Sequence, residues 1–144
     1  MLVTVSINGV PLDLDIEPYR TLAEVLPERG LGRAHQGCAD GTCGECTVLV
    51  DGEAVRSCLM LAVQCDGADV RTVEGLSVDH PLRAALRTAG AGECERCIPG
   101  LVMLAAGAMD DDPERLGRLL AANVCRRAEH EKAEQIVIRA AAGD

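Results

Sequence analysis

Eight cysteines are the residues of this 144-residue chain whose type and spacing could do chemistry. They stand at positions 38, 43, 46, 58, 65, 94, 97 and 125. In a short secreted protein an even number of cysteines indicates disulfides, whereas in a reducing compartment it indicates metal or redox chemistry. The N-terminus has no basic region followed by a long apolar stretch, so we expect no secretory signal and a cytoplasmic location. Metal binding is therefore the favoured interpretation.

The first group of cysteines has the spacing of a plant-type iron–sulfur site. Cys38, Cys43 and Cys46 form C-x4-C-x2-C, and Cys58 follows after eleven further residues. Three glycines within residues 37–44 let the backbone fold tightly around an anionic cluster and direct amide N–H groups at its sulfurs. A structural zinc protein is the alternative, but zinc sites more often use paired C-x2-C units.

The second group of cysteines is less complete. Cys94 and Cys97 form C-x2-C, and Cys125 follows 28 residues later. The pair and the single cysteine each stand directly before a helical pattern, where free N–H groups and the helix dipole lower the pKa of a thiol and favour an anionic cluster. Three cysteines alone do not complete a four-cysteine site.

The first half of the chain predicts a small mixed sheet with one helix. Alternating apolar and polar residues predict the strands, and the pairs Asn8-Gly9 and Asp51-Gly52 predict hairpin turns. A capping box at Thr21 and Glu24 opens a short helix that Pro27 ends. The expected strands are 2–7, 12–16, 47–50, 53–56, 61–64 and 70–73.

The second half predicts four helices, which begin after a join at residues 74–77. Asp79 caps the first helix, with Pro81 in its first turn, and Asp112 precedes the third. Apolar residues at helical spacing mark the interior face of each helix. The corresponding stretches are 81–87, 98–105, 113–120 and 133–140. Together the two halves predict an α+β fold that ends in a four-helix unit.

Composition excludes two classes of partner. The chain has one Tyr, no Phe and no Trp, and its formal net charge is −9. It therefore offers neither aromatic stacking platforms nor a net positive charge to nucleic acid. The longest apolar run, residues 98–109, has 12 residues, whereas a bilayer span needs roughly 18. We expect no membrane span.

Several motifs in order resemble the iron–sulfur subunits of the molybdenum hydroxylases, the group of xanthine dehydrogenase, aldehyde oxidoreductase and aerobic CO dehydrogenase. The resemblance covers nearly the whole chain. It implies an N-terminal β-grasp, plant-type ferredoxin-like domain at 1–76 and a C-terminal four-helix bundle domain at 77–144. Each domain of that family holds one [2Fe–2S] cluster. The motifs are Val5–Gly9, 37–47, Arg56–Leu59 and Thr72–Leu76.

The resemblance also implies the cluster ligands. Those of the first cluster are Cys38, Cys43, Cys46 and Cys58, and the matches to the second are Cys94, Cys97 and Cys125. Arg127 stands where the family has its fourth cysteine, and Glu93 stands where the family has a Gln that approaches the pterin. A guanidinium has no lone pair to give to iron, so a standard four-cysteine site is not available here.

Three hypotheses for the second site remain. The site is empty; it borrows a ligand; or it holds a [3Fe–4S] or [4Fe–4S] cluster that needs only three thiolates, in place of a [2Fe–2S] cluster. The candidates for a borrowed ligand are Glu95, Glu129, His130, Cys65 or a residue of a partner chain. For Cys65 the alternative role is that of a small buried apolar residue.

The resemblance implies electron transfer, with catalysis on another chain. Electrons would leave the molybdenum cofactor of a large partner subunit, pass through the helical site to the first cluster, and continue to an FAD-binding medium subunit or an external carrier. The alternative is a free-standing ferredoxin-like carrier or redox sensor with a degenerate helical site. No Ser/His/Asp set, phosphate-binding loop or pair of catalytic carboxylates stands out in the sequence.

Overall fold

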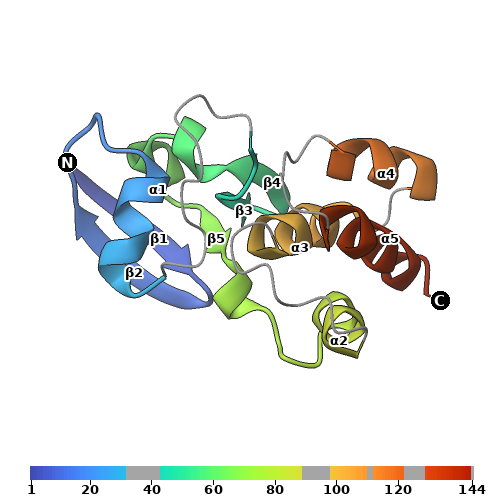
Figure 1. Ribbon diagram of the computed structural model, residues 1–144. Helices are drawn as coiled ribbons and strands as arrows, with labels where there is room; N and C mark the ends of the chain where they lie inside the picture. Colours follow the sequence, from blue (N-terminus) through green and yellow to red (C-terminus); the bar gives the residue numbers. More distant parts are fainter. Residues whose placement is uncertain (32–42, 89–97, 110–111, 122–128, 144) are drawn as a thin grey trace.

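The computed structural model describes residues 1–31, 43–88, 98–109, 112–121 and 129–143. Its first half forms a five-stranded sheet in the order β2-β1-β5-β3-β4 (Figure 1). β1 and β5 are parallel, and the other pairs are antiparallel. The strands are β1 (Leu2–Ile7), β2 (Val10–Asp15), β3 (Thr47–Val50), β4 (Glu53–Arg56) and β5 (Asp69–Arg71). The two predicted hairpins and the mixed sheet are confirmed.

Both hairpins turn through left-handed backbone. Asn8 and Gly9 have φ angles of 52° and 83°, and Asp51 and Gly52 have 51° and 85°. Positive φ at both central residues belongs to the two-residue turn whose twist matches that of paired strands, which is why Asn-Gly and Asp-Gly stand here.

The first α-helix ends just before Pro27, and a 3₁₀ helix follows it. Glu24 caps the α-helix, because its Oε2 accepts the N–H of Thr21 at 2.7 Å. After α1 (Leu22–Val25) the chain continues through Pro27 as the 3₁₀ helix η1 (Leu26–Arg29). The predicted end of the α-helix before Pro27 is confirmed, and the chain continues in 3₁₀ geometry because a proline in a first helical turn sacrifices no required N–H bond.

The predicted strand at 61–64 is also wrong. Ala62–Cys65 forms a 3₁₀ helix, η3, and Leu61 makes only an isolated bridge with Thr21. The side chain of Gln64 stabilises this turn, because its Oε1 accepts the N–H of Leu61 at 2.9 Å. Two more 3₁₀ turns, η2 (Ser57–Leu59) and η4 (Val73–Gly75), follow β4 and β5.

The four predicted helices are confirmed, and α5 packs against the other three (Figure 1). Asp112 caps α4 through its Oδ1, which accepts the N–H of Arg115 at 2.9 Å. The predicted cap Asp79 is wrong, because Nδ1 of His80 accepts the N–H of Leu82 at 3.3 Å. The helices are α2 (Pro81–Thr88), α3 (Ile98–Ala106), α4 (Pro113–Ala121) and α5 (Glu129–Ala141).

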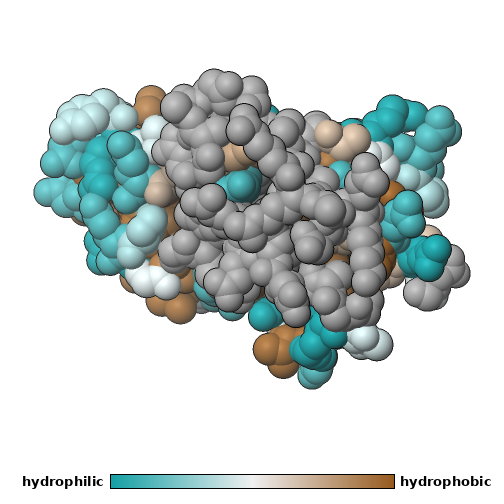
Figure 2. Space-filling model, in the orientation of Figure 1, coloured by the Kyte–Doolittle hydropathy of each residue, from teal (hydrophilic) through white to brown (hydrophobic). Residues whose placement is uncertain are grey.

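The apolar side chains form two clusters, and β3 contributes to both, with Leu49 in one and Val48 and Val50 in the other. One cluster lies under the sheet and the other among the helices, and Leu49 and Val73 of the sheet half belong to the second. α3 packs against β3 and β4 and so joins the halves (Figure 1). Over the β1–β2 hairpin and over α4 and α5, the coloured surface in Figure 2 is mostly hydrophilic.

The segment after β5 is held on the first hairpin turn. Asn8 Nδ2 donates to Thr72 Oγ1, and the Thr72 N–H donates to Asn8 Oδ1, both at 2.9 Å. Thr72 is fully buried, and its hydroxyl donates to Glu74 Oε2 at 2.6 Å. A Cβ on Gly75 would lie 2.1 Å from Asn8 Oδ1. Two of the family-like motifs, 5–9 and 72–76, thus fit together.

Within the described ranges, no helix has the length and apolar character needed to cross a membrane.

Candidate metal centre

β3 and β4 bring two of the first-group cysteines together. Thr47, the first residue of β3, pairs with Arg56, the last residue of β4. Cys46 directly precedes β3, and Cys58 lies two residues beyond β4, in η2. The N–H of Cys58 donates to Cys46 Sγ at 3.4 Å. A hairpin that the sequence predicts therefore places two cysteines, twelve positions apart, side by side.

The site directs amide groups at sulfur. The N–H of Glu45 donates to Cys43 Sγ at 3.4 Å, as that of Cys58 does to Cys46 Sγ. Cys46 is 1% exposed, Cys43 and Cys58 are partly exposed, and all three are free of disulfides. N–H donors stabilise the negative charge of cluster-bound thiolates and tune their potential. These residues fit an anionic iron–sulfur cluster.

Two buried hydroxyls fix the backbone of this loop. Thr47 donates to the Gly44 carbonyl through Oγ1 at 2.7 Å and through its N–H at 3.2 Å. Ser57 donates to the Cys46 carbonyl through Oγ at 2.7 Å and through its N–H at 3.3 Å. Neither residue is a predicted ligand. The sequence does contain a feature that could have indicated this role, because Thr47 and Ser57 are small hydroxyl residues that each stand directly beside a candidate ligand.

We expect Thr47→Val to destabilise the cysteine loop. The change keeps the shape of the side chain but removes the hydroxyl, and Thr47 is 3% exposed, so the Gly44 carbonyl loses a buried donor. A loss of this kind costs about 1 to 2 kcal/mol. Urea unfolding measures it, with Thr47→Ser as the control that keeps the hydroxyl. Equal stability of the valine and serine variants would contradict the assigned role.

The remaining candidate ligands lie outside the described residues. These are Cys38 of the first group, the whole second group, and Glu95 among the candidates for a borrowed ligand. Arg127, at the position of the missing fourth cysteine, also lies outside the described residues. Glu129 and His130 lie on α5, but their side chains are likewise not described. In the described part of the chain, no three His, Cys, Asp or Glu side chains surround a single ion position. A [2Fe–2S] cluster instead divides its ligands between two irons.

Cys65 lies apart from this loop, in the core under the sheet. It is 1% exposed, and its Sγ lies 4.0 Å from Met60 Sδ. Burial raises the pKa of its thiol, and the carboxylate of Asp51 raises it further. A thiol with a raised pKa is a poor metal ligand. The interpretation of Cys65 as a core residue is confirmed, although it lies in η3 and not in a strand.

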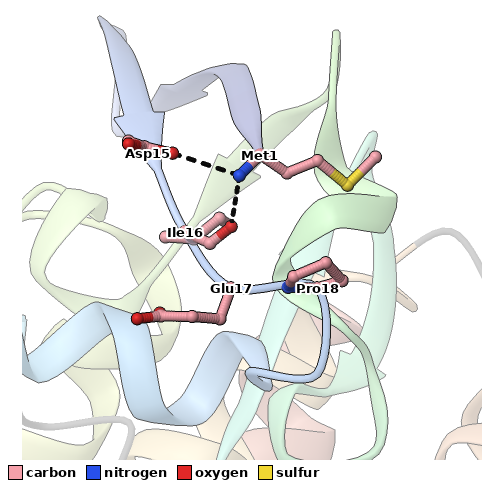
Figure 3. Close-up of a pocket in the computed structure, with 5 residues that line it drawn as sticks. All are labelled: Met1, Asp15, Ile16, Glu17 and Pro18. Carbon is pink, nitrogen blue, oxygen red and sulfur yellow. Dashed lines mark hydrogen bonds and ion pairs between the residues drawn. The ribbon is translucent and has the colours of Figure 1, made fainter.

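A hollow of about 270 Å³ lies at the start of the chain, where Met1 meets the end of β2 (Figure 3). The Met1 ammonium donates to Asp15 Oδ1 at 3.1 Å and to the Ile16 carbonyl at 2.8 Å. Glu17 and Pro18 complete the lining, and no cysteine belongs to it. The hollow has no part in the metal chemistry.

Comparison with known proteins gives close relatives in sequence. The chain is 41% identical to the xanthine dehydrogenase iron-sulfur-binding subunit of Escherichia coli O157:H7 over 130 residues, which cover 84% of this chain and 82% of the relative. It is 39% identical over 132 residues to the 6-hydroxypseudooxynicotine dehydrogenase complex subunit beta of Paenarthrobacter nicotinovorans, with 85% and 82% covered. No protein-family model matches the chain.

Solved structures agree with the sequence relatives. A chain of quinoline 2-oxidoreductase from Pseudomonas putida 86 matches with a TM-score of 0.84 and 34% identity, covering 99% of this chain and 96% of that one. The aldehyde oxidoreductase of Desulfovibrio desulfuricans matches with a TM-score of 0.88 and 32% identity, covering 98% of this chain but 17% of that one. The protein belongs to the family of electron-transferring iron–sulfur subunits of the molybdenum hydroxylases.

Proposed function

We propose that this chain relays single electrons from a molybdenum centre on a larger partner subunit to an acceptor. The observation that carries the proposal is the loop in which backbone N–H groups donate to the sulfurs of Cys43 and Cys46. Cys38, Cys43, Cys46 and Cys58 would hold a [2Fe–2S] cluster. When bound, such a cluster supplies a site that accepts and donates one electron at a time.

Residues of this chain fix the backbone of the site and shield one of its sulfurs from water. Thr47 and Ser57 fix the carbonyls of Gly44 and Cys46, so the loop keeps its shape whether the sulfurs carry more or less negative charge. Burial of Cys46 keeps water from its sulfur. A rigid, partly dry site lowers the reorganisation that accompanies a change of charge.

The finer architecture follows the same proposal. Residues 1–76 would be a β-grasp, ferredoxin-like domain, and residues 77–144 a four-helix bundle domain. The second domain would use Cys94, Cys97 and Cys125, with Arg127 in place of a fourth thiolate. The contacts of α5 with α2, α3 and α4 support the bundle.

The partner proposal rests on the names of the relatives. One is the iron-sulfur-binding subunit of a xanthine dehydrogenase, and another is a subunit of a dehydrogenase complex. By analogy, this chain would dock to a larger subunit that carries the molybdenum cofactor. The acceptor would be an FAD-binding medium subunit or an external carrier.

Purification of the tagged chain from its native cells tests the function. We expect it to co-elute with a larger chain, the pool to contain molybdenum and iron, and dithionite reduction to produce a [2Fe–2S] signal in low-temperature EPR. A monomer with one such cluster would support the free-standing carrier instead. A colourless preparation that contains zinc and no iron would overturn both.

A further inference from the structure

Helix α3 touches the cysteine loop through a glycine. A Cβ on Gly100 would lie 2.2 Å from the Gly44 carbonyl oxygen and 3.0 Å from the Cα of Glu45. In proteins a Cβ essentially never lies within 3.0 Å of a neighbouring heavy atom to which it is not bonded. The two backbones are therefore in contact only because position 100 has no side chain.

Neither the cysteine loop nor helix α3 can shift easily to make room for a side chain at position 100. The Gly44 carbonyl accepts two hydrogen bonds from Thr47, and the N–H of Glu45 donates to Cys43 Sγ. On the helix side, the next three residues, 101–103, are almost completely buried. Ordinary contact begins at 3.4 Å, so an alanine at position 100 would have to move the loop and helix apart by 1.2 Å, the difference between 3.4 and 2.2 Å.

The other glycines near α3 make a different kind of contact. A Cβ on Gly107, just beyond α3, would lie 2.9 Å from Leu49 Cδ2, the end of a flexible side chain, and 3.3 Å from both the Cβ and the backbone N of Ala54 in β4. A Cβ on Gly117, in α4, would meet only Ile138 Cδ1, at 3.7 Å. Of the described glycines in the helical half, Gly100 alone abuts backbone of the cysteine loop.

We propose that Gly100 is a positioning residue for electron transfer, because it allows the helical half to contact the loop between Cys43 and Cys46. This inference rests on the proposed function. The iron–sulfur cluster proposed for Cys94, Cys97 and Cys125 would be oxidised by one electron, and the first cluster would be reduced by that electron. The substrate-reduced molybdenum centre of the partner would then reduce the donor cluster again. No bond breaks and no proton moves. The missing side chain keeps the two backbones within contact distance along this route.

The test uses the complete complex and methyl viologen radical, generated by pulse radiolysis, as the electron source. The measured quantity is the concentration-independent rate at which the first cluster becomes reduced. Electron tunnelling slows steeply as two redox centres move apart, so we expect Gly100→Ala, which must separate the helix from the loop, to slow this phase severalfold. Gly117→Ala is the matched control, and we expect it and Gly107→Ala to stay within about twofold of the unchanged protein.

Each outcome bears on one proposal. If the unchanged complex shows no iron–sulfur signal, the proposed function fails. If the cluster is present and the Gly100→Ala rate equals that of Gly117→Ala, the inference about Gly100 fails alone. If Gly107→Ala slows the phase as strongly as Gly100→Ala, general packing of α3 governs the rate, and the inference is likewise overturned.

A measurement on the unchanged chain covers the case in which Gly100→Ala does not fold. Nuclear magnetic resonance of the full 144-residue chain records how strongly the reduced cluster relaxes each amide proton. We expect a much larger effect at Gly100 than at Gly107, which packs on Leu49 and Ala54 of the β3–β4 hairpin. Equal relaxation at the two glycines would show that the contact is absent.

Discussion

Cys46→Ala is expected to abolish the first cluster. Cys46 is the most buried of the described first-group cysteines, and its sulfur accepts the N–H of Cys58, so no nearby group can replace it without rebuilding the loop. Loss of one of four thiolates leaves an iron without its ligand set. We expect the reduced [2Fe–2S] signal to vanish and iron content to fall by about two atoms per chain. EPR and iron analysis of the purified variant measure both.

Cys65→Ala is the matched control for this experiment. Cys46 and Cys65 are both 1% exposed and undergo the same substitution, but Cys65 lies in the core beside Met60. We expect the cluster signal to persist and stability to fall by about 1 kcal/mol, as for a small loss of core volume. Loss of the signal in Cys65→Ala, or its survival in Cys46→Ala, would overturn the ligand assignment.

Gly75→Ala is expected to cost about 3 kcal/mol, because the added methyl group would displace the Asn8 side chain from Thr72. That side chain makes two hydrogen bonds with Thr72, which is fully buried, and the new Cβ would lie 2.1 Å from its oxygen. Urea unfolding of the metal-free and cluster-bound chains measures the loss. Gly117→Ala, whose Cβ would make only an ordinary contact with Ile138, is the control and should not destabilise.

A double-mutant cycle separates this clash from a general effect of alanine. Asn8 has a φ of 52°, so Asn8→Gly keeps its turn while removing the side chain that Gly75→Ala would strike. We expect the double variant to be clearly more stable than the sum of the two single losses predicts. Additive losses would show that the methyl group and Asn8 do not meet.

Local signals account for what the sequence predicts of the fold. Asn8-Gly9 and Asp51-Gly52 specify their own turns, and the four helices follow from apolar spacing within each segment. The predictions failed where a side chain bonds to the local backbone. Gln64 stabilises a 3₁₀ turn in a strand-like run, and His80 caps α2 in place of Asp79.

In the candidate site, too, local sequence patterns predict some features and miss others. Cysteine spacing predicts the ligands, and the hairpin between Thr47 and Arg56 predicts that Cys46 and Cys58 approach each other. The contact of Gly100 with Gly44 joins segments 56 positions apart, and nothing in either segment alone indicates it. Such tertiary contacts depend on how α3 settles on β3, which local patterns do not encode.

The place of β5 in the sheet determines the order in which the protein can fold. This three-residue strand comes last in the sequence of strands but lies between β1 and β3, so the sheet stays open until Arg71 has left the ribosome. Asn8 likewise waits for Thr72, 64 positions later. Such non-local pairing is slow, and N-terminal units fold first during synthesis. The helices, whose core includes Leu49 and Val73, therefore pack against residues of β3 and of the segment after β5, and their core is complete only when both are in place.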